Sequence, residues 1–353
     1  MTKEDRHLLL ELLQRYKDLG IAEQIDYDKF YLYSIIAHST AIEGSTVTEV
    51  EAQLLFDEGI TSSKRTLVEQ MMNLDLKAAY DFGIRWIKLH EPITVDWLIK
   101  LASKVMARTG SEYHSIAGDF SSAKGELRKL NVTAGFGGRS YMSYLKVPVK
   151  LEAFCEELNK LRRAVDKEDL AAVYELSFWA HYGLVTIHPW ADGNGRMSRL
   201  LMNLLQIEFG VIPAKVLKED KSEYIQSLID TREQDNVDIF ISCMTRLHCR
   251  HLKSDIDAFT KSTDVKVVDK QALQAELTGK WSIKSSIAEK MVDILDYMAD
   301  KESVTTDEIV RRFGLAPTTA KRYLRQLSES GFLIAGGGNR NRTYRCPRMA
   351  IPS

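Results

Sequence analysis

The sequence of 353 residues lacks the features that mark several protein classes. Its four cysteines, Cys155, Cys243, Cys249 and Cys346, form no CxxC pair and follow no zinc-ligand spacing, so we expect neither a disulfide framework nor a zinc site. Seven prolines and twenty glycines are few, which favours long helices over an all-β fold. The formal net charge is −1, so any surface that binds nucleic acid must be local.

Long apolar runs are also missing. No stretch approaches the roughly 20 apolar residues that a membrane-spanning helix needs. Residues 1–6 are polar, and the short apolar run that follows is interrupted by Glu11, so the start of the sequence is too short and too polar for a signal peptide. We therefore expect a cytoplasmic protein with reduced thiols and no membrane contact.

Apolar residues at helical spacing are what the chain has in abundance. They predict helices throughout residues 1–110, over 149–165 and 170–184, and from about residue 195. The segment Thr-Val-Thr-Glu at 46–49 is predicted to cap a helix start. This pattern indicates a mainly α protein.

A cluster of glycines interrupts the helical pattern over residues 111–148. Two short segments, 128–133 and 141–147, flank the glycine-rich turn at 135–138. That arrangement predicts a small β-hairpin at 125–147 in an otherwise helical region.

The C-terminal part has a layout of its own. Residues 253–285 are polar and weakly patterned, which predicts a linker. Three amphipathic helices followed by two short strands are then predicted over 286–353, the order of a winged helix-turn-helix, an α+β domain. We expect this domain to follow an N-terminal helical region at 1–110 and a central domain at 111–252.

The segment 188–199, HPWADGNGRMSR, contains residue types that suit a phosphate ligand. Gly193 and Gly195 precede a predicted helix, where glycine lets the backbone approach a ligand and free N–H groups attract an anion. Arg196 and Arg199 lie on nearly the same side of the first turn. Their charges oppose the helix dipole, a local cost that an anionic ligand would remove.

Asp192 and His188 add two further chemical groups to this segment. A carboxylate beside a polyphosphate is a usual way to hold Mg²⁺. An imidazole with a pKa near ~6.5 is suited to accept a proton from a hydroxyl. Each piece alone is typical of an ordinary turn and a surface helix, but together they favour transfer of part of a nucleoside triphosphate to a protein hydroxyl.

At these residues the sequence resembles the Fic family, whose signature is His-x-Phe-x-(Asp/Glu)-Gly-Asn-Gly-Arg-x-x-Arg. Residues 188–199 match it except at Trp190, where the family has Phe, and tryptophan keeps a large aromatic there. The resemblance implies a Fic-type helical bundle with a hairpin flap. It also implies transfer of AMP from ATP, with Mg²⁺, to a Ser, Thr or Tyr hydroxyl of a protein, self-modification included.

The resemblance also implies a role for each motif residue. His188 would deprotonate the acceptor, and Asp192 would hold Mg²⁺ against the α- and β-phosphates. The phosphates would be held by the remaining polar and glycine positions, which are Gly193, Asn194, Gly195, Arg196 and Arg199. Gly195 separates this chain from the Doc branch, which carries Lys at that position and phosphorylates its target.

Residues 39–44 resemble the family's inhibitory helix, (Ser/Thr)-x-x-x-Glu-(Gly/Asn), through Ser39, Glu43 and Gly44. A helix over about 30–44 would end at this glycine. The resemblance implies that Glu43 pairs with Arg199, so that ATP binds unproductively and the resting enzyme is off. The alternative is a solvated glutamate before a helix stop. Some relatives use the equivalent glutamate to remove AMP, which leaves a nucleotidyl-protein hydrolase as another possible function.

Two further segments resemble parts of the family's site. Residues 125–133, with Arg128 and Val132, resemble the flap on which an acceptor segment lies as an added strand; the alternative is an ordinary surface hairpin. Tyr224 resembles a residue on the adenine side, where relatives often have two adjacent tyrosines and this chain has Ile225 second. Arg232 stands where some relatives have Asn, so the nucleotide preference is less firmly implied than phosphate binding.

The third helix of the predicted winged helix is basic, as contact with a DNA backbone requires. Threonines at its start could reach base edges. The residues predicted to bind DNA are Thr318, Thr319, Lys321, Arg322 and Arg325. Winged helices also bind proteins or form homodimers, so these alternatives stay open. A DNA-binding regulator with a nucleotide-sensing Fic core is therefore a second candidate function.

Overall fold

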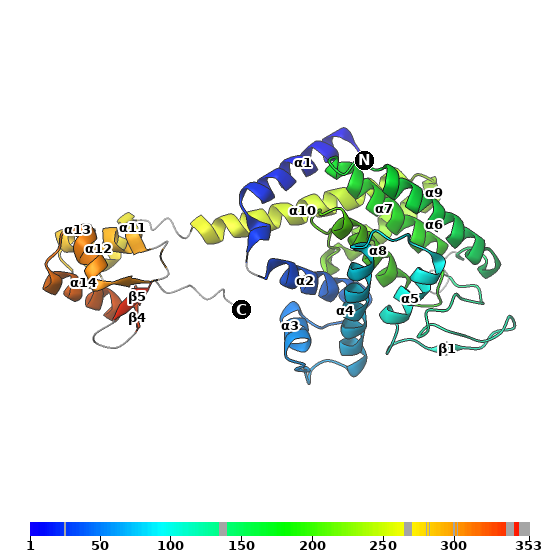
Figure 1. Cartoon of the computed structure of the whole chain (residues 1–353), viewed down its shortest axis with the longest axis horizontal. Coiled ribbons are helices and arrows are strands. Elements are labelled where there is room, and N and C mark those ends of the chain that lie inside the picture. The colour runs from blue at the N-terminus through cyan, green and yellow to red at the C-terminus, as the bar shows by residue number, and fades with distance from the viewer. Residues whose placement is uncertain are drawn as a thin grey trace. The chain divides into compact units, whose positions relative to one another are not determined.

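The computed structural model shows a mainly helical chain with few short strands, as the sequence predicts (Figure 1). The structure describes residues 1–24, 26–133, 140–264, 270–279, 281, 283–298, 301, 303–336 and 342–345. The chain divides into two compact units, Met1–Asp257 and Ala258–Ser353. Within the described residues, every helix is too short or too polar to cross a bilayer.

The first unit is built almost entirely from helices. Its helical elements are α1 (Lys3–Asp18), η1 (Ile21–Glu23), α2 (Tyr27–Ile42), α3 (Glu49–Asp57), α4 (Leu67–Ile87), α5 (Val95–Val105), η2 (Tyr144–Lys146), α6 (Val147–Ala164), α7 (Leu170–Ile187), α8 (Asn194–Glu208), η3 (Lys218–Asp220), α9 (Lys221–Gln234) and α10 (Val237–Asp264). The strands β1 (Glu112–Tyr113) and β2 (Phe120–Ser121) form an antiparallel pair between α5 and η2.

Helices α7 and α8 pack against each other and, with α4, α5 and α6, surround the main hydrophobic core (Figure 1). The apolar face predicted for the helix near residue 195 is buried as expected: Met197, Leu200, Leu201, Leu204 and Leu205. Ala180 and Leu184 of α7 are buried in the same core. The loop between α7 and α8, residues 188–193, therefore connects two helices whose positions are fixed by packing.

One predicted cap is shifted by two residues. Thr48, not Thr46, caps α3, and it forms a capping box with Glu51. Thr46 instead bonds through its backbone N–H and its hydroxyl to Glu69, which belongs to the capping box of α4. Two threonines two residues apart offered the same cap chemistry, and the contact with α4 decides between them.

The predicted hairpin at 125–147 is only partly correct. Thr133 pairs with Ser140 in an isolated antiparallel bridge, and the N–H of Tyr141 donates to the carbonyl of Val132. The second arm was predicted as a strand to residue 147, but η2 begins at Tyr144. Pro148 near the start of α6 fits this change, since proline suits the first turn of a helix. The turn at 134–139 lies outside the described residues.

The second unit has the predicted winged-helix layout. Its elements are α11 (Lys270–Gly279), α12 (Ser285–Met298), β3 (Val304–Thr305), α13 (Thr306–Phe313), α14 (Pro317–Glu329), β4 (Ile334–Gly336) and β5 (Thr343–Arg345). Thr305 caps α13 with a capping box to Glu308, and Gly314 ends it with φ 61°. The strands β4 and β5 are antiparallel, and β3 adds a third strand on the other side of β5.

The predicted linker at 253–285 is mostly helix. Helix α10 continues to Asp264, because Leu252 and Ile256 bury one face while the polar residues between them face outward. Helix α11 contributes Leu277 to the core of the second unit. Only residues 265–269, which lie outside the described residues, separate the two helices. The expected boundary between residues 110 and 111 does not divide the compact first unit.

Candidate active site

The loop that carries the motif begins and ends at residues with a left-handed backbone conformation, His188 and Gly193. His188 caps the C-terminus of α7 in the left-handed region, with φ 52° and ψ 61°. A left-handed histidine is uncommon and marks a position fixed by its surroundings. Gly193, with φ 80°, precedes the first residue of α8. The chain thus leaves one buried helix at His188 and enters the next at Asn194.

Asn194 closes this loop rather than pointing into it. Its carboxamide accepts from the N–H of Trp190 at 3.1 Å and donates to the carbonyl of the same residue at 2.8 Å. The side chain is 3% exposed. The sequence predicted that Asn194 would hold phosphates; in this structure its amide bonds within the loop, and its phosphate contact stays a prediction.

The imidazole of His188 is arranged as a neutral base. Its Nδ1 lies 3.3 Å from the carbonyl of Val185, and since a carbonyl only accepts, Nδ1 carries the proton and Nε2 keeps its lone pair. Tyr141 stacks on the ring with centroids 3.7 Å apart. Burial, with smaller contributions from Arg128 and Arg232, lowers the pKa of His188 to about 4. The ring is therefore uncharged at neutral pH, with its single proton on Nδ1.

Arg128 joins the flap to the start of the motif. Its Nε donates to the carbonyl of His188 at 2.8 Å, and its other nitrogens donate to the carbonyls of Leu130 and Met142. The side chain is 2% exposed. Arg128 was predicted as a flap residue that meets the target, but its side chain turns inward and fixes the flap, because three carbonyls and a buried site hold it there.

The substitution of Trp190 for phenylalanine adds a second link to the flap. The indole is buried, and its Nε1 donates to the carbonyl of Gly125 at 2.9 Å. Phenylalanine has no such donor. A Cβ on Gly125 would lie 2.1 Å from the carbonyl oxygen of Ile99, so a glycine at the base of the flap also permits close approach to α5.

Arg196 is a buried cation with incomplete pairing. It is 3% exposed, and its nitrogens reach the carbonyl of Val105 at 3.3 Å and the sulfur of Met106 at 3.0 Å. Asp192 lies 3.9 Å away, and Nε has no hydrogen-bond partner in the described part of the chain. Burial lowers the pKa of Arg196. Such a group is stabilised by an anion that enters the site.

Arg199 is also buried, but a carboxylate pairs with it. Its Nη2 donates to Glu43 Oε1 at 2.6 Å and to the carbonyl of Ser39 at 2.9 Å, while Nε donates to the hydroxyl of Ser39 at 2.9 Å. The pairing of Glu43 with Arg199 that the sequence predicted is therefore present. Burial alone would raise the pKa of Glu43, but the charges of Arg199 and Arg196 outweigh it and hold that pKa below its usual value.

Gly195 lies directly against this ion pair. A Cβ at this position would lie 2.5 Å from Glu43 Oε1 and 3.1 Å from Arg199 Nη1. A Cβ on Gly193 would meet the sulfur of Met106 at 2.7 Å. A side chain at either position would therefore force a neighbouring side chain to shift, and at Gly195 that neighbour is the carboxylate of the predicted inhibitory segment.

Asp192 is suited to a metal only together with a ligand. Its side chain is 57% exposed, and Oδ1 accepts from the N–H of Gly193 at 2.6 Å. The described residues contain no group of three or more His, Cys, Asp or Glu side chains placed to hold a metal ion. Mg²⁺ is commonly held by one or two carboxylates with substrate phosphates, so one exposed aspartate beside the anion site fits it.

The predicted adenine-side residues lie on α9. Tyr224 is 1% exposed, and its hydroxyl lies 3.0 Å from Nε2 of the buried His181. Its ring centroid is 6.0 Å from the guanidinium of Arg199, so Tyr224 packs behind this arginine. Arg232 points to the flap instead, where it donates to the carbonyl of Ser140 at 2.5 Å.

The structure thus places the motif, the predicted inhibitory segment and the flap together, all within the first unit. The sequence did not predict the contact of Tyr141 with His188 or the contacts that link Trp190 to Gly125. A stacking partner across about 47 residues leaves no local pattern, although an aromatic beside the hairpin turn was a signal that could have been followed.

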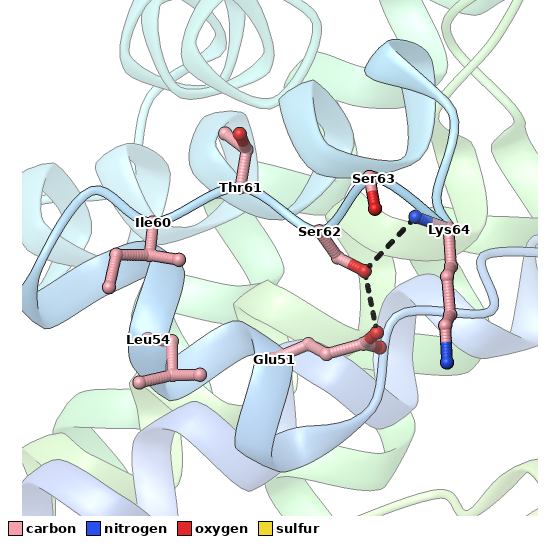
Figure 2. Close-up of a pocket in the computed structure, with 7 residues that line it drawn as sticks. All are labelled: Glu51, Leu54, Ile60, Thr61, Ser62, Ser63 and Lys64. Atoms are coloured by element: carbon pink, nitrogen blue, oxygen red, sulfur yellow. Dashed lines mark hydrogen bonds between the residues drawn. The ribbon is translucent and has the colours of Figure 1, made fainter.

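Neither of two surface pockets in the described part of the chain is lined by His188. One of about 340 Å³ lies between α3 and the segment before α4, where Ser62 donates to Glu51 (Figure 2). It contains no motif residue and is not the candidate site. A larger one of about 620 Å³ lies beside Gly44 and is lined by Lys218 and Lys221 near the start of α9.

In the second unit, the helix predicted to bind DNA has a polar, basic outer face. Thr318, Lys321, Arg322 and Arg325 are exposed on α14, and Thr319 is half-buried. The opposite face of α14 supplies the core of the unit through Ala320, Tyr323, Leu324 and Leu327.

Comparison with known proteins agrees with this geometry. The Fic/DOC family matches residues 92–206, and the IclR helix-turn-helix domain matches residues 288–334. A Protein adenylyltransferase fic-1 from Caenorhabditis elegans is 26% identical over 205 residues, which are 57% of this chain and 36% of that protein. A Protein adenylyltransferase Fic from Nematostella vectensis is 27% identical over 233 residues, 65% of this chain and 49% of that protein.

A solved structure extends the likeness in fold to both units. A Fic family protein from Desulfovibrio desulfuricans G20 is 18% identical with a TM-score of 0.60, and the match covers 100% of this chain and 98% of that one. The chain spans less than half the length of the two curated relatives that it matches. Residues 92–206 are therefore similar to the Fic/DOC family, and residues 288–334 to a helix-turn-helix domain.

Proposed function

We propose that this protein is an adenylyltransferase that transfers AMP from ATP to a hydroxyl of a protein, and that Glu43 holds it in an inhibited state. One observation carries the proposal. Two buried arginines lie in the first two turns of α8, within eleven residues of a neutral His188, and the carboxylate that pairs with Arg199 is that of Glu43, the C-cap residue of α2. The names of the relatives support the same activity.

The proposed reaction is a displacement at the α-phosphorus of ATP. Nε2 of His188 accepts the proton of the acceptor hydroxyl, and the hydroxyl oxygen bonds to the α-phosphorus. The bond from this phosphorus to the bridging oxygen of the β-phosphate breaks, and pyrophosphate leaves with the electron pair. The products are the AMP ester of the protein and pyrophosphate.

The residues of the loop supply binding and charge in this proposal. Arg196 and Arg199 pair with the phosphates, and the backbone N–H groups of Asn194 and Gly195, at the start of α8, favour an anion there. Asp192 would hold Mg²⁺, which when bound neutralises phosphate charge. The backbone edge of the flap at Val132, beside the Thr133–Ser140 bridge, would take the acceptor segment as an added strand.

Inhibition follows from competition for one cation. The Glu43 carboxylate lies 2.6 Å from Arg199, where a phosphate oxygen would otherwise bind. ATP must displace this carboxylate or bind without Arg199. We propose Ser39, Glu43 and Gly44 as the inhibitory residues: Ser39 bonds to the same guanidinium, and Gly44, with φ 104°, lets the chain turn away from the end of α2.

The test is the intact mass of the full chain after incubation with ATP and Mg²⁺. Glu43→Gly should gain adenylyl groups at least about tenfold faster than wild type, since Arg199 becomes available for one charge-assisted contact with phosphate. The double variant Glu43→Gly with His188→Ala should gain none. Parallel incubations with GTP or CTP show whether ATP is preferred. Equal labelling of wild type and Glu43→Gly would contradict inhibition, and absence of labelling in both would contradict transfer.

A hydrolase remains the other outcome for the same site. Glu43→Gly that has become labelled is mixed with unlabelled wild type and Mg²⁺, and AMP release is followed. Loss of label that depends on Glu43 of the wild type would replace transferase by nucleotidyl-protein hydrolase as the main activity. A stable label would keep the transferase proposal.

A second candidate function rests on the outer face of α14. Three exposed cations and an exposed threonine lie along one face of the helix that such domains place in the major groove. We propose that the second unit binds duplex DNA. The full chain should bind a duplex at low salt with an affinity that falls as salt rises, and replacing Lys321, Arg322 and Arg325 by Gln should abolish it. No binding at low salt would contradict the proposal and favour a protein partner or a homodimer.

A further inference from the structure

The imidazole of His188 is covered on one face by a flap tyrosine. The rings of His188 and Tyr141 are nearly parallel, with an interplanar angle of 18° and centroids 3.7 Å apart. A parallel stack of this kind covers the ring face and leaves the ring edge, where the nitrogen atoms lie, free for hydrogen bonds. The contact therefore restrains the plane of the imidazole without occupying Nε2.

Tyr141 is itself held in place by a backbone hydrogen bond across the flap and by Arg232 of α9. Its N–H donates to the carbonyl of Val132 across the flap. Arg232 of α9 donates to the carbonyl of the preceding residue, Ser140, and its guanidinium lies 5.2 Å from the centre of the Tyr141 ring. The position of the ring is thus determined by two elements that do not belong to the motif.

Two contacts together define the orientation of the imidazole. The bond from Nδ1 to Val185 selects the tautomer, and the Tyr141 ring selects the plane. A base must present its lone pair within a narrow angular range, because proton transfer weakens steeply when the hydrogen bond bends. Without the stack, rotation about the side-chain bonds of His188 is limited by one hydrogen bond of 3.3 Å.

We propose that Tyr141 is a positioning residue for His188, whose ring holds the imidazole in the plane needed for proton transfer and keeps water from its face, and that Arg232 fixes Tyr141 in this place. The proposal rests on the proposed role of His188 as the base. The phenol hydroxyl has no part in it, since the contact is made by the ring.

The charged groups around His188 allow the effect of the ring to be separated from theirs. Arg128 and Arg232 act to lower the pKa of His188, and Glu43 acts to raise it, but burial is the largest cause of the low value. Tyr141 supplies part of that burial by covering one ring face. Removing its ring should raise the pKa of His188 without changing any neighbouring charge.

The experiment combines a titration with a rate. In the full chain, the ring proton signals of the eight histidines are followed by NMR from pH 3 to 8, and His188→Gln identifies the signal of interest. Wild type and Tyr141→Phe should titrate near about 4, and Tyr141→Ala should move up by at least about one pH unit toward the ordinary value of ~6.5. Transfer is measured in parallel in the Glu43→Gly background.

Expected rates follow from the role of the ring. Tyr141→Ala should lower transfer at least about tenfold, with ATP affinity retained, and Tyr141→Phe should restore most of the rate. Tyr144→Ala, at a second tyrosine of the same segment, is the matched control for loss of an aromatic near the flap. Tyr141→Leu replaces Tyr141→Ala if the latter does not fold. Arg232→Gln should give a loss between wild type and Tyr141→Ala.

Two results would overturn the proposal: a His188 titration near about 4 in Tyr141→Ala, or an equal loss of transfer in Tyr141→Phe and Tyr141→Ala. If no variant transfers AMP, including Glu43→Gly alone, the proposed function fails. The titration still decides whether the ring controls His188, so the two failures are distinguishable.

Discussion

The two ends of the segment 188–199 are held in place by different kinds of interaction. At the first end, the side chain of His188 is held by uncharged contacts, a carbonyl and an aromatic ring, while its backbone caps α7 and accepts a hydrogen bond from Arg128. At the other end, Arg199 is held by the carboxylate of Glu43, the C-cap residue of α2. The base end is complete without a ligand, whereas the arginine end depends on an anion being present.

This difference shows where regulation can act. Removing a partner from an uncharged, packed group costs contact energy and changes its shape. Exchanging one anion for another at a buried arginine leaves the protein structure almost unchanged but decides whether the arginine can bind a ligand. A switch placed at the arginine end can therefore be released without damage to the base, which the opposite arrangement would not allow.

The largest effect should come from replacing the key side chain at each end of the segment, His188 or Arg199, in separate variants. In the Glu43→Gly background, His188→Ala should lower transfer by about 10²–10⁴-fold and leave ATP affinity nearly unchanged, because a general base acts on the reaction step. Arg199→Ala should weaken ATP binding about tenfold to a hundredfold, the range of one or two charge-assisted contacts. Calorimetry measures binding and intact mass measures transfer. Equal losses of both quantities in both variants would erase the distinction between the ends.

An intermediate effect is expected from pH. The transfer rate of Glu43→Gly should be level above about pH 5 and should fall as pH drops through about 4, because protonated His188 cannot accept a proton. Each further unit below that value should cost about tenfold. Initial rates by intact mass measure this, with circular dichroism at each pH as the control for folding. A midpoint near 6.5 would show that His188 is as hydrated as a free imidazole.

The smallest effect should come from Trp190→Phe, which restores the residue of the family signature. The loss of the bond from Nε1 to the carbonyl of Gly125 should lower the free energy of unfolding by about 1 kcal/mol. Urea denaturation followed by circular dichroism measures it. ATP affinity should not change, since Trp190 belongs to the base end. A large loss of ATP affinity would show that the two ends are coupled through the loop.

Sequence reasoning reached the local features of this site well. The motif, the pairing of Glu43 with Arg199 and the capping box at Thr305 follow from residues whose spacing limits what they can do. The winged-helix order of the second unit follows from periodicity and glycine stops, and it is confirmed. Roles of individual residues remain proposals.

The structure departs from the local expectation where several partners compete for one group. Asn194 has a side chain that suits a phosphate, but in this structure its carboxamide forms hydrogen bonds to the backbone of Trp190. Arg128 suits an exposed flap, but three carbonyls draw it inward. The polar run after residue 252 resembles a linker because α10 exposes one face of its last turns. These outcomes depend on tertiary packing, which local composition does not encode.

Gly195 carries a consequence for how this chain could change over time. Its missing side chain leaves the space that the Glu43 carboxylate fills. The side chains allowed at position 195 and at position 43 are therefore limited by each other. Any larger residue at 195 would require the Glu43 carboxylate or the Arg199 guanidinium to shift. If Glu43 inhibits the site as proposed, substitutions at the two positions should therefore be coupled.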